Sequence, residues 1–191
     1  MRTEITIKEY QIKGMICSRC IKVLKNELKE TGAEVIEIKL GKVIVRFNPN
    51  FVDSSFLKRV IINNDFEILI RKEEILAEQT KINIINYVWE EDAQLNLSEY
   101  LSNKMELSYN LISKNFSEVF HYTVERYFII IKIERTKELI ENGERNYSEI
   151  SYLLGYSNLS ALSRQFKKET GLTMKEYQHL KMNTRVPIDG I

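Results

Sequence analysis

The sequence contains little cysteine, histidine, glycine or proline. Its 191 residues include two Cys, two His, seven Gly and two Pro. Two Cys and two His are too few for a Cys-rich zinc cluster or a three-His catalytic site within one chain. The low Gly and Pro content excludes fibrous and low-complexity classes and predicts long regular elements.

An excess of one charge and a long apolar run are also missing. The chain has 28 basic and 27 acidic residues, a formal net charge of +1. An indiscriminate nucleic-acid binder is usually strongly basic, so any DNA binding must come from a local surface. The longest apolar run, Tyr127 to Ile131, has five residues, whereas a membrane span needs about 20. Because no signal peptide is readable at the N-terminus either, we expect a cytoplasmic protein without membrane contact.

A hairpin pattern lies in the first third of the chain. Apolar residues alternate with polar ones from 36 to 47 on either side of Gly41-Lys42, which predicts two strands joined by a two-residue primed turn. The strand before it changes parity between Ile7 and Tyr10. That change indicates a bulge or a late strand start.

Helical patterns flank the predicted hairpin. One begins near Cys20 and has Gly32 at its C-terminal end, and another follows Asp53 or Ser54 as its cap. With a last short strand, the order of elements is βαββαβ. We therefore predict an α+β fold class in which residues 1–71 form a ferredoxin-like domain.

Strand patterns are absent after this domain. Residues 73–91 have helical spacing, and residues 123–142 indicate one long helix that Gly143 ends. The sequence therefore predicts an all-α domain over residues 72–184, followed by a C-terminal tail of residues 185–191.

The helical half repeats itself at an offset of 50 residues. The matching positions are a tetrapeptide and two aromatic residues in each copy: Asn96–Glu99 with Asn146–Glu149, Phe116 with Phe166, and Tyr127 with Tyr177. Each copy opens with Asn-x-x-Glu, which is typical of a capped helix start. A turn and a second helix follow, capped by Ser108 in the first copy and by Ser157 or Asn158 in the second. Two helix-turn-helix units are therefore predicted, with the aromatic residues in their cores.

The second copy resembles a known family along most of its length. The residues that carry the resemblance are Ile150-Ser151-Tyr152-Leu153-Leu154-Gly155-Tyr156-Ser157, Ser163-Arg164-Gln165-Phe166, Gly171-Leu172-Thr173 and Tyr177. They are similar to the second helix-turn-helix of the AraC/XylS family of bacterial transcription regulators, and the resemblance extends over residues 73–181. It implies double-stranded DNA and RNA polymerase as partners. Because one chain carries two reading helices, either a monomer or a homodimer is expected.

The family pattern also implies the residues that contact DNA. Base-facing candidates are Tyr109, Asn110, Ser113 and Lys114 in the first copy and Leu159, Ser160, Ala161, Ser163 and Arg164 in the second, with Lys167 as a phosphate contact. Arg164 is the strongest candidate, because arginine binds guanine through two hydrogen bonds. Residues 159–181 hold five Lys or Arg against two Glu, whereas residues 97–120 hold two against three. The second unit is therefore expected to attract phosphates more strongly.

Two cysteines open the first predicted helix, in Gly14-Met15-Ile16-Cys17-Ser18-Arg19-Cys20. Thiols three positions apart at a helix start point together, and the helix dipole favours the thiolate that binds soft metals. Two thiolates without further ligands suit Cu(I) better than zinc. With the βαββαβ order, this stretch resembles the heavy-metal-associated domain of copper chaperones and metal-transporting ATPases over residues 5–70. The resemblance implies a metal site at Cys17 and Cys20, and Met15 is expected in the core.

Several functions stay open for the whole chain. The leading hypothesis is a bacterial DNA-binding transcription regulator that requires no cofactor and is modulated by Cu(I), another soft metal ion or redox state at the thiols. The alternative is a copper-binding carrier or sensor whose helical half docks a protein partner. A third is a regulator whose first domain keeps its fold without a ligand and serves only dimerisation or protein contact. No hydrolase, transferase or nucleotide-binding signature is present, so an enzyme is not expected.

Overall fold

The computed structural model describes residues 4–15, 17–90 and 95–180. The chain divides into two compact units, Met1–Ile82 and Asn83–Ile191. The division falls inside helix α3 (Lys72–Trp89), whereas the boundary expected from the sequence is the start of that helix. The predicted tail of residues 185–191 and Ile16 of the thiol motif lie outside the described residues.

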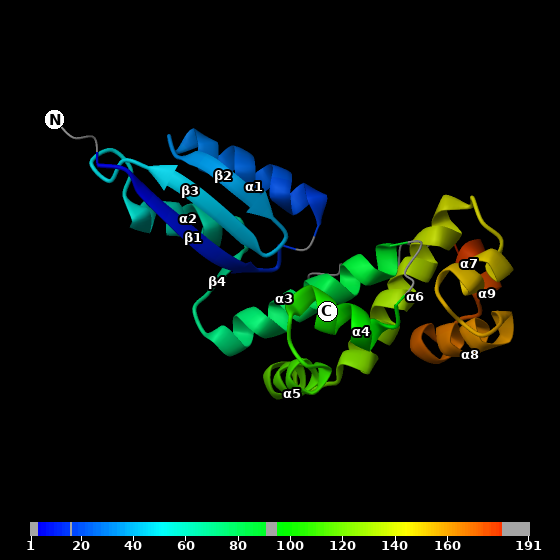
Figure 1. Ribbon diagram of the computed structural model, residues 1–191. Coiled ribbons are helices and arrows are strands. Elements are labelled where there is room, and N and C mark those ends of the chain that lie inside the picture. The colour runs from blue at the N-terminus through cyan, green and yellow to red at the C-terminus, as the bar shows by residue number, and fades with distance from the viewer. Residues whose placement is uncertain (1–3, 16, 91–94, 181–191) are drawn as a thin grey trace. The chain divides into compact units, whose positions relative to one another are not determined.

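The first unit contains a small antiparallel sheet and two helices (Figure 1). Its elements are β1 (Thr6–Lys13), α1 (Ser18–Glu30), β2 (Glu34–Lys39), β3 (Lys42–Phe47), α2 (Ser54–Asn63) and β4 (Glu67–Leu69). The strands lie in the order β2-β3-β1-β4. Both helices pack on one face of the sheet, where Leu24 of α1 and Leu57 of α2 join Tyr10 and Ile12 of β1 in one core.

The hairpin between β2 and β3 differs by one residue from the prediction. Lys39 pairs with Lys42, so the loop is Leu40-Gly41 rather than Gly41-Lys42. Primed turns need a positive φ at the first loop residue, but the positive φ of +72° belongs to Gly41, the second. The predicted primed turn is therefore wrong. In this register Gly41 forms backbone hydrogen bonds with Met15 and Ile12, both outside the hairpin.

The first strand, β1, lacks the bulge offered as one explanation of its parity change, whereas β2 contains a bulge that was not expected. β1 pairs with β3 without interruption from Thr6 onward, so the parity change in β1 is not a bulge. Ile7 points away from the core and is 58% exposed. The irregularity lies in β2, between Val35 and Glu37. It turns Ile36 outward, against the simple alternation that the sequence predicted for this strand.

The described part of the second unit is helical. Its elements after α3 are α4 (Leu97–Met105), α5 (Tyr109–Phe120), α6 (Val124–Asn142), α7 (Tyr147–Leu153), α8 (Leu159–Thr170) and α9 (Met174–His179). The pairs α4 and α7, α5 and α8, and α6 and α9 each begin 50 residues apart. The internal repeat is therefore a repeat of structure. In the described residues, no helix combines the length and the apolarity that a membrane crossing requires.

Caps set the starts of these helices. The Asn96 side chain accepts from the Glu99 N–H in α4, and Asn146 with Glu149 forms a complete capping box in α7. Ser108 caps α5, and Asn158, rather than Ser157, caps α8. These short polar side chains satisfy helix N–H groups that have no partner within the helix.

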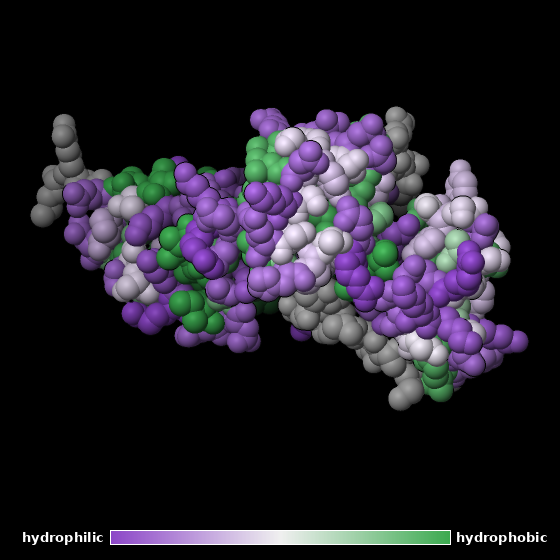
Figure 2. Space-filling view, turned by 90° about the horizontal axis from the view of Figure 1, so that it is seen from below, coloured by the Kyte–Doolittle hydropathy of each residue, from purple (hydrophilic) through white to green (hydrophobic). Residues whose placement is uncertain are grey.

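Helix α6 packs into the cores of both copies of the repeat. Tyr127, near its start, is fully buried and its ring centroid lies 5.8 Å from that of Phe116. Ile133 and Leu139 join Phe166 and Tyr177 in the core of the second copy. The prediction that all four aromatic residues are core residues is confirmed. On the face of the molecule shown in Figure 2, polar residues predominate and hydrophobic residues form small separate patches.

Candidate nucleic-acid interface

Helix α8 is held firmly by its inner face. Leu162 and Phe166 are fully buried there, and the Phe166 ring meets that of Tyr177 edge to face at 5.7 Å. The Asn158 side chain accepts from the Ala161 N–H at 2.9 Å. Gly171 ends the helix with a φ of +76°, a conformation that costs glycine little. The outer face is therefore presented by a well-anchored helix.

The outer face of α8 carries the strongest candidates. Ser160, Arg164 and Lys167 are exposed, and their spacing places them on one stripe of the helix. Leu159, Ala161 and Ser163 are partly buried beside it. Among the described residues, neither Arg164 nor Lys167 has a carboxylate within ion-pair distance. Both cations are therefore available to a polyanion.

The corresponding helix of the first copy is electrostatically different. Asn110 and Lys114 are exposed, and Ser113 is partly buried. The Lys114 Nζ lies 3.9 Å from a carboxylate oxygen of Glu118, one helical turn later. The attraction of Lys114 for a phosphate is therefore reduced by its own neighbour.

Tyr109 is also engaged within the protein. Its hydroxyl donates to the carboxylate of Glu125 at the start of α6. Burial, and then this hydrogen bond, raise the pKa of Tyr109, and the bond holds the pKa of Glu125 below its usual value. Glu125 therefore stays negative next to the N-terminal end of α5, where a nucleic acid would approach.

The repeat shows what replaces these acids in the second copy. At the offset of 50, Glu118 corresponds to Lys168 and Glu125 corresponds to Lys175. Both lysines are exposed. The predicted charge difference between the two units is thus concentrated on and beside α5 and α8. The two acids were not among the residues selected from the sequence, although alignment of the copies position by position would have found them.

An ion pair links α8 to α6. The Arg126 guanidinium donates to a carboxylate oxygen of Glu169 at 2.7 Å, and Gln165 donates to the same oxygen at 2.8 Å. The bond to Arg126 is the main reason why the pKa of Glu169 lies below its usual value. The one acid of α8 therefore faces a partner within the protein.

The thiol pair lies in the first unit, at the start of α1. The Cys17 Sγ accepts from the Cys20 N–H at 3.4 Å, and the two Sγ atoms are 2.9 Å apart. Cys17 is exposed, Cys20 is partly buried, and neither is in a disulfide. The described residues offer no group of three His, Cys, Asp or Glu side chains that could hold a metal. Met15 is fully buried in the core, as predicted.

Backbone contacts fix the segment next to the thiols. The Gly41 N–H donates to the Met15 carbonyl at 3.0 Å, and the Ile12 N–H donates to the Gly41 carbonyl at 2.8 Å. A Cβ atom at Gly41 would lie 2.5 Å from Cδ1 of Ile82 in α3. The Gly14 N–H donates to the Glu78 carboxylate, also in α3, at 3.1 Å. The thiol segment therefore contacts the hairpin and α3 within the same unit.

Comparison with known proteins gives a match in the helical half. The model of a family described as "Helix-turn-helix domain" matches residues 101–179. The probable transcriptional regulator LumQ of Photobacterium leiognathi is 25% identical over 132 residues, 66% of this chain and 53% of LumQ. The uncharacterized HTH-type transcriptional regulator YdeC of Bacillus subtilis (strain 168) is 21% identical over 124 residues, 65% of this chain and 42% of YdeC.

Among solved structures, the C-terminal domain of AraT, a response regulator from Geobacillus stearothermophilus, has a TM-score of 0.49 at 18% identity and covers 61% of this chain and 94% of that chain. The chain spans about half or less of the length of LumQ and YdeC. Both are named as transcriptional regulators, in agreement with the prediction that this chain is not an enzyme. The family match falls on the duplicated helices α4 to α9. The helical half of the chain is therefore similar to a helix-turn-helix domain over residues 101–179.

Proposed function

We propose that this chain is a bacterial transcription regulator that binds operator DNA with both helix-turn-helix units and reads it mainly with α8. The observation that carries the proposal is the exposed stripe of Ser160, Arg164 and Lys167 on a helix whose other face is buried. Recognition helices enter the major groove with such a face, where Arg reads guanine and Lys holds phosphate. RNA polymerase is the protein partner that this role implies.

The length of α6 supports simultaneous use of both units. Its 19 residues correspond to about 28 Å at 1.5 Å per residue. Successive major grooves on one side of DNA are about 34 Å apart. A helix of this length, with one copy of the repeat packed toward each end, suits two reading helices in adjacent grooves. A monomer is therefore sufficient for binding, and a homodimer would bind two such stretches of DNA.

Selection of bound sequences from a random DNA pool tests this proposal. We expect a discrete motif, and on that motif Arg164→Ala should lose about tenfold or more in affinity and relax the preference at one base pair. Lys167→Ala should weaken binding evenly across sequences and lower the salt slope by about one. Arg59→Ala, an exposed arginine on α2, is the matched control. Unchanged binding by Arg164→Ala would refute the assignment of α8.

For the first unit, we propose a ferredoxin-like domain of the heavy-metal-associated kind. The element order β1-α1-β2-β3-α2-β4 and the sheet order β2-β3-β1-β4 support it, as does the position of both thiols at the first helix. The donor set fits Cu(I), which accepts two thiolates. Two bonds of about 2.3 Å, the length of a zinc–thiolate bond, would separate the sulfurs by more than the present 2.9 Å. Metal binding would therefore move Cys17 or Cys20.

We further propose that such a movement is transmitted to α3. The supporting contacts are those of Gly14 with Glu78 and of Gly41 with Ile82. Burial raises the pKa of Glu78, and the Gly14 N–H partly offsets that rise. A shift of the thiol segment would therefore change the environment of a buried carboxyl on α3. The C-terminal end of that helix belongs to the helical unit.

The effector is tested by measuring operator affinity of the reduced protein, the Cu(I)-loaded protein and the oxidised protein. Modulation predicts that affinity differs between at least two of these states and that Cys17→Ser with Cys20→Ser abolishes the difference. Equal affinity in all three states would instead indicate a regulator whose first unit serves only dimerisation or protein contact. Copper binding without a selected DNA motif would favour the carrier that docks a protein partner.

A further inference from the structure

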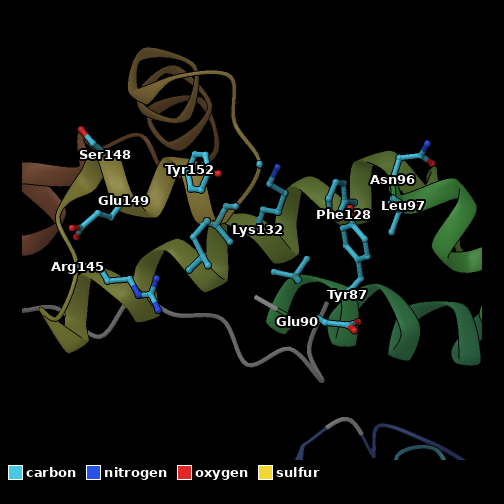
Figure 3. Close-up of a pocket in the computed structure, with 14 residues that line it drawn as sticks. Tyr87, Glu90, Asn96, Leu97, Phe128, Lys132, Arg145, Ser148, Glu149 and Tyr152 are labelled. Atoms are coloured by element: carbon cyan, nitrogen blue, oxygen red, sulfur yellow. The ribbon is translucent and has the colours of Figure 1, made fainter. Parts of the chain in front are cut away.

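A pocket of about 890 Å³ lies in the helical unit, lined by residues of α3, α6 and α7 and by the start of α4 (Figure 3). None of its lining residues belongs to α5 or α8. Its volume is within the range of about 300 to 1,000 Å³ that is usual for small-molecule sites. The pocket is therefore distinct from the candidate DNA-binding stripe.

One wall of this pocket carries a buried lysine. Lys132 of α6 is 8% exposed, and its Nζ lies 3.9 Å from the ring centroid of Tyr156 and 5.0 Å from that of Phe128. Figure 3 shows its side chain between Tyr152 and Phe128. Among the described residues, the ammonium has no carboxylate or other hydrogen-bond acceptor in reach. Burial alone lowers the pKa of Lys132 to about 8.

The other buried lysine of the same helix, Lys137, and the partly buried Arg135 are both paired with carboxylates. The Lys137 Nζ lies 2.7 Å from a carboxylate oxygen of Glu134, and Arg135 lies 2.7 Å from Glu138. A buried charge costs free energy unless a partner compensates it. The ring of Tyr156 offsets part of that cost for Lys132, but it leaves the N–H groups of the ammonium without an acceptor. An anion in the pocket would supply the acceptor that this ammonium lacks.

The other residues that line the pocket indicate which other chemical groups a bound molecule would have. Tyr87, Phe128 and Leu153 provide aromatic and aliphatic surface. Arg145 adds a second cation, whereas Glu90 and Glu149 also line the pocket and disfavour a high negative charge. From this combination we infer that the pocket binds a small amphipathic monocarboxylate, with the carboxylate on the Lys132 Nζ and the apolar body against Tyr87 and Phe128.

Paired probes that differ only in charge test this inference on the full chain. Naphthalene-2-acetate and its neutral amide are titrated by calorimetry at pH 7 in the absence of DNA. A charge-assisted hydrogen bond should make the acetate bind the unsubstituted protein about tenfold or more tightly than the amide. In Lys132→Met the preference should disappear. Lys104→Met is the matched control, because Lys104 also lies over a ring, that of Tyr100 at 5.5 Å, but is exposed and outside the pocket.

A second measurement covers the case in which Lys132→Met does not fold. The Lys132 ammonium of the unsubstituted protein is followed by NMR as a function of pH. Its pKa should rise when naphthalene-2-acetate is added and stay unchanged with the amide. Equal affinity for the two probes, a preference that survives in Lys132→Met, or an Nζ pKa that ignores the acetate would each overturn the assignment. Because no DNA is present, these outcomes are independent of the proposed regulator function.

Discussion

Lys132 also gives a quantitative prediction for folding. Its pKa falls from 10.5 to about 8 because of burial, which corresponds to about 3 kcal/mol at 1.36 kcal/mol per unit. The ring of Tyr156 returns up to about 2 kcal/mol as a cation–π contact. Lys132→Met keeps the apolar stem and removes the charge. At pH 7 it should therefore raise the free energy of unfolding of the helical unit by about 1 to 3 kcal/mol.

The dependence on pH has a definite sign. Between pH 8 and 10.5 the folded protein releases the Lys132 proton while the unfolded chain keeps it. The unfolded state then binds more protons, so the stability of the unsubstituted protein rises with pH across this window. The advantage of Lys132→Met should be largest below pH 8 and should vanish above pH 10.5. Burial raises the pKa of Tyr156 to about 12, so this neighbour stays neutral in the window.

Trp89 provides the assay. It is the one tryptophan of the chain, it lies at the end of α3, and the Arg135 guanidinium sits 5.2 Å from its ring centroid. Urea unfolding followed by its fluorescence reports on the helical unit. The other charged groups around the pocket, Glu90, Arg145 and Glu149, are common to both proteins. A loss of stability in Lys132→Met at pH 7, or a difference independent of pH, would refute this account of the buried charge.

Three further substitutions test the interface and its scaffold. Glu118→Lys gives the first unit the charge that Lys168 gives the second. It should raise DNA affinity and steepen the salt dependence of binding by about one phosphate contact, both measured by fluorescence anisotropy. An unchanged affinity and salt dependence would mean that α5 does not approach DNA. Asn158→Ala removes the cap of α8 and should cost about 1 kcal/mol in urea unfolding, and an unchanged midpoint would contradict the capping role. Phe166→Ala leaves a cavity under α8 and should cost about 3 to 5 kcal/mol, so a loss below 1 kcal/mol would contradict its place in the core.

Local patterns were sufficient to predict the helices of the second half. Three helices begin at residues whose side chains cap them, namely Asn96, Ser108 and Asn146. Helix α6 ends at Gly143, whose backbone is left-handed. Because caps and apolar spacing act within a few residues, the sequence determines them without knowledge of the fold. The internal repeat then extended each assignment from one copy to the other.

Features that depend on distant contacts were not predictable in the same way. The hairpin register depends on more than the turn itself. Gly41 donates a hydrogen bond to the Met15 carbonyl, and a Cβ atom at this position would lie 2.5 Å from Cδ1 of Ile82. The bond from Tyr109 to Glu125 joins residues 16 positions apart. The pocket around Lys132 requires residues from four helices. The contacts of the predicted DNA-binding residues with bases stay predictions, since they depend on a partner outside the chain.

Duplication explains how a protein of net charge +1 could bind DNA strongly. The two copies share the order of their helices, and α5 and α8 each begin at a capping side chain and bury an aromatic residue, Phe116 or Phe166. They differ in exposed charge: α5 has Lys114 and Glu118, which offset each other, whereas α8 has Arg164, Lys167 and Lys168, and its one acid, Glu169, is bound to Arg126. Counterion release depends on the cations that reach phosphates and not on the net charge. The salt dependence of binding should therefore be set by α8, and substitution of the uncharged α5 residues Asn110 and Ser113 should change sequence preference more than the salt slope.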